Sequence, residues 1–311
     1  MSNALYATLL HALAPLCPAG LPATAAAQPP PATPTEMHPA LVSIVAVGLC
    51  VLAVWAIRRI ARPAKLYLDR TPGRPNHLNC VHVVIVLAAY WLAASGAQGL
   101  LETLFLPEAG DEAARQAVKV RLQLASAAIG AAVWLGVGLL AAAMTFRHSL
   151  KRGLGMSGRR WLYDTGRAVL GYLTILPICV GLNLAAVYVF SILGISPRYH
   201  PVLEHQESFS PTWRALSIVS TVVLAPLAEE VFFRGLLQSM IRRYLRSGWL
   251  AVLIASALFA AMHLNQPQAI GSLFALAVAM GYNYERTGRL FAPILIHAIF
   301  NAVNLALWRV G

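Results

Sequence analysis

The stretch that decides the fold is LAPLAEEVFFRGLLQ, residues 224–238. It places Glu229, Glu230 and Arg234 within six residues of an otherwise apolar run. A charged side chain at the centre of a membrane helix costs roughly 2.5–3.5 kcal/mol on insertion scales. Three such groups close together therefore need partners, a function, or both.

The composition indicates that this run belongs to a membrane protein. Of the 311 residues, 58% are hydrophobic and 12% are charged, whereas an average soluble domain is roughly 45–50% apolar and about 25% charged. The formal net charge of +12 would by itself suggest a nucleic-acid partner. The basic residues flank apolar runs, however, so we interpret them as charges that orient the chain in the bilayer and expect no nucleic-acid binding.

Eight apolar segments are candidate spanning helices, which predicts an all-α, polytopic transmembrane helical bundle. They lie near residues 39–57, 81–101, 122–146, 166–194, 214–241, 249–264, 268–284 and 290–308. Basic loops follow the first, third, fifth and seventh segments, and an acidic loop follows the second. Positive-inside counting assigns the basic loops to the cytoplasm without a forced inversion. We therefore expect an integral, multi-pass protein of a bacterial plasma membrane, in contact with the lipid bilayer.

The first 37 residues differ in character from the rest. An apolar stretch leads to ATAAAQPPPATPT, which resembles the end of a signal peptide with a cleavage site after Ala27. No Lys or Arg precedes the apolar stretch, so an uncleaved apolar arm is the alternative. We predict a signal-like leader and Pro-rich linker over residues 1–37, and one multi-pass membrane domain over residues 38–311.

The spacing of the three charges predicts an ion pair. Glu230 and Arg234 are four residues apart on one helix face, so the two can neutralise each other in a low dielectric. Glu229 lies about 100° around the helix and has no partner in the segment. Pro226 removes a backbone donor just before the pair and can loosen the helix there.

Two later segments carry polar residues at helical spacing. Phe259 and His263 are one turn apart, and His297, Asn301 and Asn304 are spaced i, i+4 and i+7 on one face. Any one of them could be a helix–helix hydrogen bond worth about 0.6–2 kcal/mol. Counted from the basic helix ends, however, the histidines, the first asparagine and the unpaired carboxylate lie in one layer of the bilayer, which favours a shared site.

A carboxylate, two imidazoles and a carboxamide in one dry layer form a plausible water-activating site. Glu229 can act as the base, His263 and His297 can orient the water, and Asn301 can donate to a developing oxyanion. A metal site uses the same atoms, because Glu229, His263 and His297 could hold zinc with an open position for water. The residues alone leave both alternatives open, so no cofactor is assigned with certainty.

Three short motifs carry a resemblance to a known family. They are EEVFFR (229–234), FAAMH (259–263) and HAIFN (297–301). In order and spacing they resemble the EExxxR, FxxxH and HxxxN motifs of the CAAX protease and bacteriocin-processing family of intramembrane proteases, also called type II CAAX prenyl endopeptidases. The resemblance covers roughly residues 160–311, and residues 1–150 match no motif of the family.

The resemblance implies a role for each motif position. Glu229 matches the general base, and His263 matches the residue that helps to hold the attacking water. His297 and Asn301 match the pair that binds the oxyanion or, in the metalloprotease view, helps to bind a metal. The remaining motif positions, which match a supporting role, are Glu230, Arg234 and Phe259.

We therefore expect an intramembrane endopeptidase that hydrolyses a peptide bond in or at the membrane with a Glu-activated water, acting on a membrane-associated peptide or protein. Eukaryotic members of the family trim prenylated CAAX proteins, and many bacterial members serve in peptide maturation, bacteriocin self-immunity or secretion. A non-catalytic membrane scaffold or bacteriocin-immunity protein of the same fold is the alternative. A transporter that uses Glu229 and the histidines as a proton relay is a third possibility, which the ordered motifs disfavour.

Overall fold

The structure is a computed structural model that describes residues 39–61, 68, 74–107, 111–147, 150–156, 160–198 and 209–308. The leader and linker predicted over residues 1–37 lie outside this part of the chain. Within the described ranges the chain is helical and contains no β-strand, although an isolated bridge joins Asn76 and Phe146. The predicted all-α class is confirmed.

Each of the eight predicted segments corresponds to a helix. Six of them are α2 (Pro39–Ile60), α3 (Cys80–Phe105), α4 (Glu112–Thr145), α6 (Trp161–Leu193), α12 (Ile270–Thr287) and α13 (Phe291–Trp308). The predicted segment 249–264 corresponds to α11 (Gly248–Ala261). The predicted segment 214–241 corresponds to a run of consecutive helical segments over Pro211–Leu245, which we call the broken helix. Short helices α5 (Leu150–Gly153) and η7 (Pro267–Ala269) lie in connections.

The number of long spans is smaller than predicted. In the described chain, five helices are long and apolar enough to cross a membrane, namely α2, α3, α4, α6 and the broken helix. Helices α11 and α13 are apolar but shorter. The polytopic bundle is therefore confirmed, while three of its predicted spanning segments are short or less apolar helices packed beside the long ones.

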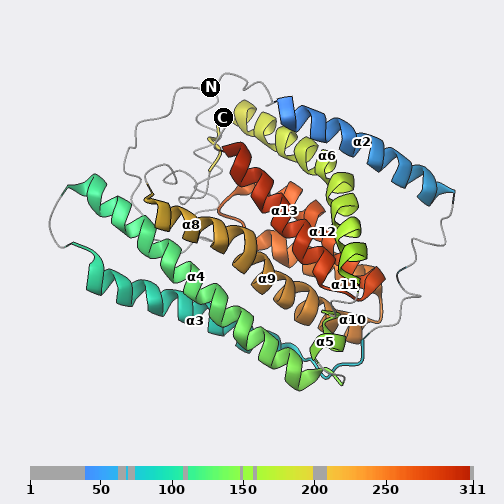
Figure 1. Cartoon of the computed structure of the whole chain (residues 1–311), viewed down its shortest axis with the longest axis horizontal. Coiled ribbons are helices and arrows are strands. Elements are labelled where there is room, and N and C mark those ends of the chain that lie inside the picture. Colours follow the sequence, from blue (N-terminus) through green and yellow to red (C-terminus); the bar gives the residue numbers. More distant parts are fainter. Residues whose placement is uncertain are drawn as a thin grey trace.

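The broken helix lies at the centre of the bundle (Figure 1). On one side it packs against α4, which pairs with α3 in a hairpin, and on the other it packs against α11, α12 and α13. Helix α6 contacts α12 and α13, and α2 packs on α6 at the edge of the bundle. This arrangement shields Glu230 and Arg234 of the broken helix from lipid, where an exposed charge would be costly.

Small residues allow the outer helices to approach closely. A Cβ on Gly130 of α4 would lie 2.8 Å from Ala94 Cβ of α3. A Cβ on Gly48 of α2 would lie 2.7 Å from the Leu173 carbonyl of α6. Without a hydrophobic driving force between helices in lipid, such close backbone contacts provide the packing energy.

Basic side chains gather where several helices end. Arg74, just before α3, hydrogen-bonds Tyr284 near the end of α12, and Arg243 at the end of the broken helix donates to the Leu78 carbonyl at 2.7 Å. We call this region the basic end; its residues include Arg74, Arg147, Arg160, Arg242, Arg243, Arg246 and Arg289. It is the end that positive-inside counting assigns to the cytoplasm.

Candidate active site

The charged motif spans the junction between a short α-helix and a π-helix. The broken helix consists of α8 (Pro211–Val219), η5 (Ser220–Leu224), α9 (Ala225–Glu230), η6 (Val231–Gln238) and α10 (Ser239–Leu245). The two glutamates therefore end the α-helical segment α9, and Arg234 lies in the π-helix η6. Short π-helical segments within α-helices are rare and frequently mark functional sites.

A missing backbone donor explains one contact of the site. In η5 the Ala225 N–H donates to the Ser220 carbonyl, five residues earlier. The next bond in this register would run from residue 226 to the Thr221 carbonyl, but Pro226 has no N–H. Asn301 of α13 replaces it, because its Nδ2 donates to the Thr221 carbonyl at 2.8 Å. Asn301 therefore satisfies the orphaned carbonyl and ties α13 to the broken helix.

The ion pair predicted within the motif is present and fully buried. Arg234 NH1 donates to Glu230 Oε1 at 2.6 Å, and the side chains are 1% and 0% exposed. Arg234 NH2 also donates to the Ala277 carbonyl of α12 at 3.2 Å. His297 of α13 joins the same carboxylate, with its Nδ1 3.0 Å from Glu230 Oε1. Glu230 is thus the hub that connects the first and third motifs.

This contact defines the hydrogen-bonding capacity of the His297 ring. An ionised carboxylate such as Glu230 can only accept hydrogen bonds, so Nδ1 is the donor in this pair. In the neutral imidazole the other nitrogen, Nε2, then carries a lone pair. That nitrogen lies near the first glutamate of the motif, at 3.9 Å from Glu229 Oε2.

Glu229 differs from its neighbour in having no direct partner. Its Oε2 is buried but accepts no hydrogen bond within the described residues, and the side chain is 18% exposed. The 3.9 Å gap to His297 Nε2 is too long for a hydrogen bond and suits a bridging water. Glu229 is therefore the acidic group of the cluster that remains available for chemistry.

Phe259 holds the two histidines apart. Its ring is fully buried, and its centroid lies 5.1 Å from the His263 ring and 5.6 Å from the His297 ring. The Arg234 guanidinium carbon lies 4.9 Å from the same ring, a cation–π distance. The supporting position that the resemblance implied for Phe259 thus contacts all three motifs.

His263 occupies a different local structure from the one predicted. We expected it on a membrane helix that reaches residue 264, but α11 ends at Ala261 and His263 lies in the following turn. Its Nδ1 is 3.0 Å from the Phe259 carbonyl. Since a carbonyl only accepts, Nδ1 is the donor, and Nε2 of the neutral ring is left to other partners.

The predicted metal site does not form as a ligand cluster. Among the described residues, no group of three or more His, Cys, Asp and Glu side chains is placed to hold a metal ion. Glu229, His263 and His297 therefore do not form a three-ligand cluster in this structure. The structure does not support the metal alternative.

Tyr90 and Trp134 lie near the site and were not predicted from the sequence. Tyr90 of α3 is close enough to Glu229 for the two groups to interact electrostatically. The ring centroids of Tyr90 and Trp134 of α4 are 4.7 Å apart. The ring centroid of Trp134 lies 5.0 Å from that of Phe232, which is within the motif. No short motif marks Tyr90 in the sequence, because its proximity arises from packing of the α3–α4 hairpin.

A row of polar contacts leads from the site to the basic end. Side chains four residues apart on the broken helix meet positions four residues apart on α12. Arg234 NH2 donates to the Ala277 carbonyl at 3.2 Å, Gln238 Nε2 to the Gly281 carbonyl at 3.1 Å, and Arg242 Nε to Glu285 Oε1 at 3.0 Å. We call this row the polar seam. The regular spacing of Glu230, Arg234, Gln238 and Arg242 was a sequence signal for it.

The fold and the site define a polytopic all-α membrane protein with a buried Glu–Arg–His cluster. Residues 211–303 match the family model described as type II CAAX prenyl endopeptidase Rce1-like. This segment, which contains all three motifs, is similar to the Rce1-like family, and the match agrees with the predicted resemblance.

Two curated proteins of bacteria are similar to part of the chain. One is an uncharacterized 24.3 kDa protein of Escherichia coli, 35% identical over 85 residues, which are 26% of this chain and 39% of that protein. The other is the uncharacterized protein YpbD of Bacillus subtilis (strain 168), 35% identical over 89 residues, which are 28% of this chain and 42% of that protein. The chain thus spans about two fifths of the length of these relatives. No solved structure matches the chain.

Proposed function

We propose that the chain is an intramembrane endopeptidase of the CAAX-protease type, in which Glu229 activates a water that hydrolyses a peptide bond. The observation that carries the proposal is the free carboxylate oxygen of Glu229, buried and 3.9 Å from His297 Nε2. Glu230 also has an oxygen, Oε2, without a hydrogen-bond partner among the described residues. Its Oε1 is bound to Arg234 and His297, however, and its side chain is 0% exposed, so it is held in place and closed to substrate. The two adjacent glutamates therefore have different roles.

In the proposed reaction, a water lies between Glu229 and His297 and donates one hydrogen to each. Its lone pair then faces the substrate carbonyl carbon. As the oxygen attacks, Glu229 takes the proton and a tetrahedral intermediate with a negative oxygen forms. The C–N bond then breaks, and the proton held by Glu229 passes to the departing nitrogen.

Two further motif residues complete the proposed site. Asn301 has two amide hydrogens, and Thr221 uses one of them, so the second can donate to the oxyanion. His263, whose Nδ1 donates to the Phe259 carbonyl, keeps Nε2 as a hydrogen-bond acceptor. Both hydrogens of the attacking water are already used, so this nitrogen can orient a second water or the substrate N–H. Glu230, Arg234 and Phe259 position these groups.

The proposed substrate is a membrane-associated peptide or protein, and the bilayer is the medium of the reaction. The burial of Glu230 and Arg234 in an apolar bundle supports a substrate that enters from the membrane. The two similar proteins from bacteria support the plasma membrane of a bacterium as the location.

Cleavage in proteoliposomes tests the proposal. The full chain is reconstituted with a library of lipidated and membrane-anchored peptides, and products are measured by mass spectrometry. We expect Glu229→Gln to reduce cleavage at least 100-fold, as loss of a general base does. Glu112→Gln is the matched control, because this carboxylate is 86% exposed and far from the motif in sequence.

Three results would count against the proposal. Equal cleavage by wild type and Glu229→Gln would remove Glu229 from the reaction. Loss of cleavage on addition of a chelator would restore the metal alternative. Retention of a bound peptide by wild type and Glu229→Gln, without cleavage by either, would favour the non-catalytic scaffold.

A further inference from the structure

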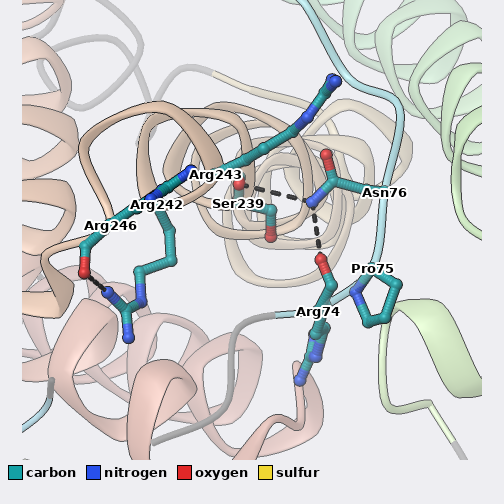
Figure 2. Close-up of a pocket in the computed structure, with 7 residues that line it drawn as sticks. All are labelled: Arg74, Pro75, Asn76, Ser239, Arg242, Arg243 and Arg246. Carbon is teal, nitrogen blue, oxygen red and sulfur yellow. Dashed lines mark hydrogen bonds between the residues drawn. The ribbon is translucent and has the colours of Figure 1, made fainter. Parts of the chain in front are cut away.

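A cavity of about 330 Å³ opens at the basic end, apart from the glutamate site (Figure 2). It is lined by Arg74, Pro75, Asn76, Ser239, Arg242, Arg243 and Arg246. The arginines come from two distant parts of the chain, the segment before α3 and the last turn of the broken helix. Four guanidinium groups around one cavity form a strongly positive site.

The charge of this cavity is only partly compensated. Arg242 pairs with Glu285 at 3.0 Å. In the described chain, neither Arg74 nor Arg243 forms an ion pair, and both donate instead to neutral oxygens, those of Gly153 and Leu78 among them. Arg74 NH2 is buried and has no hydrogen-bond partner among the described residues. A buried guanidinium nitrogen without an acceptor is costly, so the positive charge beside this cavity is incompletely compensated by the described residues.

The backbone conformation of Arg246 is a second unusual feature of the cavity. Arg246 has a φ of 56° and is the one non-glycine residue with positive φ in the described ranges. This left-handed conformation costs roughly 1–2 kcal/mol for a residue with a Cβ, and glycine adopts it freely. The Arg246 N–H caps the helix by donating to the Arg242 carbonyl. Glycine would make the same contact at lower cost, so an arginine here supports a role for its side chain.

The surroundings of the cavity resemble a membrane interface. Tyr244 is exposed beside it, and the Arg243 guanidinium carbon lies 5.4 Å from the Tyr244 ring. Trp249 stacks on Tyr282 at 5.6 Å. Tyrosine and tryptophan concentrate at the level of lipid headgroups, and positive-inside counting assigns this end to the cytoplasmic leaflet, where anionic lipids attract basic residues.

We propose that this cavity binds a phosphate-bearing anion, with an anionic phospholipid headgroup as the expected source. Guanidinium groups match phosphate oxygens in bidentate geometry, and Arg74, Arg243 and Arg246 are among the residues that line the cavity. The inference does not depend on the proposed hydrolytic activity. Its test therefore measures binding, and either proposal can fail without the other.

The first test compares two double variants of the full chain in mild detergent. Arg243→Gln with Arg246→Gln removes two exposed charges from the cavity. Arg147→Gln with Arg160→Gln removes two exposed charges from the same basic end outside the cavity. Native mass spectrometry then measures the apparent affinity for phosphatidylglycerol, with phosphatidylcholine as the uncharged reference. We expect at least a tenfold loss of phosphatidylglycerol affinity in the first variant and less than twofold in the second.

Competition identifies the source of the phosphate. If the headgroup is the ligand, phosphatidylglycerol displaces inorganic phosphate; if soluble phosphate is the ligand, it saturates the cavity and the lipid does not displace it. Equal loss of lipid affinity in both double variants would mean that only general surface charge matters, and would overturn the site.

A single variant separates ligand binding from stability. Arg246→Gly relieves the positive φ, so we expect a higher melting temperature without lipid. The same variant should bind phosphatidylglycerol more weakly, so the lipid-induced rise in melting temperature should shrink. Unchanged lipid binding by Arg246→Gly would contradict the role of this side chain.

Discussion

The side-chain amide of Asn301 donates a hydrogen bond of 2.8 Å to the backbone carbonyl of Thr221. That carbonyl is the one that Pro226 leaves without a donor in the π-helical register of η5. The contact gives Asn301 a structural role in addition to its proposed contact with the oxyanion. The two roles can be separated, because only the structural one depends on the proline.

A double-mutant cycle measures this dependence. Asn301→Ala leaves a carbonyl without its donor and should lower the free energy of unfolding by about 1–3 kcal/mol. In a Pro226→Ala background the backbone N–H of residue 226 can replace the amide, so the cost should fall by at least ~0.5 kcal/mol. Denaturant titration of the purified protein in detergent measures all four forms. Asn304→Ala, at an exposed position three residues later on α13, is the control, and strictly additive costs would contradict the explanation.

The two neighbouring glutamates should differ sharply in their effect on stability. Glu230→Gln leaves Arg234 buried without its counter-charge and should cost about 3–5 kcal/mol. Glu229→Gln removes no hydrogen bond of the described residues and should change the free energy of unfolding by less than ~1 kcal/mol. Thermal unfolding of both variants gives the comparison. Similar losses for the two would show that Glu229 also has a buried partner.

Gly281 is required by the close approach within the polar seam. A Cβ at this position would lie 2.8 Å from Gln238 Oε1 and 3.2 Å from Val252 Cγ1. We expect Gly281→Ala to lower the free energy of unfolding by about 1–3 kcal/mol through overpacking. Gly271→Ala on the same helix is the control, since its nearest neighbour, Leu182 Cβ, is 3.9 Å away, and a helical alanine there should be neutral or stabilising. If both variants lost equal stability, the seam would not be tightly packed.

Tyr90 should influence the reaction from outside the family segment. Tyr90→Phe keeps the ring beside Trp134 and removes the hydroxyl that interacts with Glu229. We expect kcat to fall up to about tenfold, which corresponds to ~1.4 kcal/mol, with no loss of stability. Steady-state cleavage kinetics in proteoliposomes test this. A change in KM alone would mean that the ring contacts substrate and that the hydroxyl does not act on the carboxylate.

Hydropathy located the helices because membrane burial demands long apolar runs, but it placed some helix ends wrongly. Helix α4 begins at Glu112, about ten residues before the predicted start at 122, and Asp111 caps it. Hydropathy missed these first turns because they carry charges. Helix α11 ends three residues before the predicted residue 264. Pro267 follows closely and disfavours further helix, so this signal was present in the sequence.

The site could be predicted as a set of residues but not as a geometry. The spacing of Glu230 and Arg234 was sufficient to predict their pair, since both lie on one helix face. The contact of His297 with Glu230 spans 67 residues, and no local pattern encodes it. Nor does periodicity reveal the π-helical segments η5 and η6, because a continuous apolar run does not distinguish one helical register from another.

The polar seam joins parts of the chain that are synthesised at different times. Arg234, Gln238 and Arg242 each meet a partner 43 residues later in the chain, which corresponds to roughly 2–9 s of translation at 5–20 residues per second. During that interval the broken helix would expose its seam to lipid if it left the insertion channel alone. The seam therefore favours entry of the broken helix and α12 into the bilayer as a pair, after both have been synthesised.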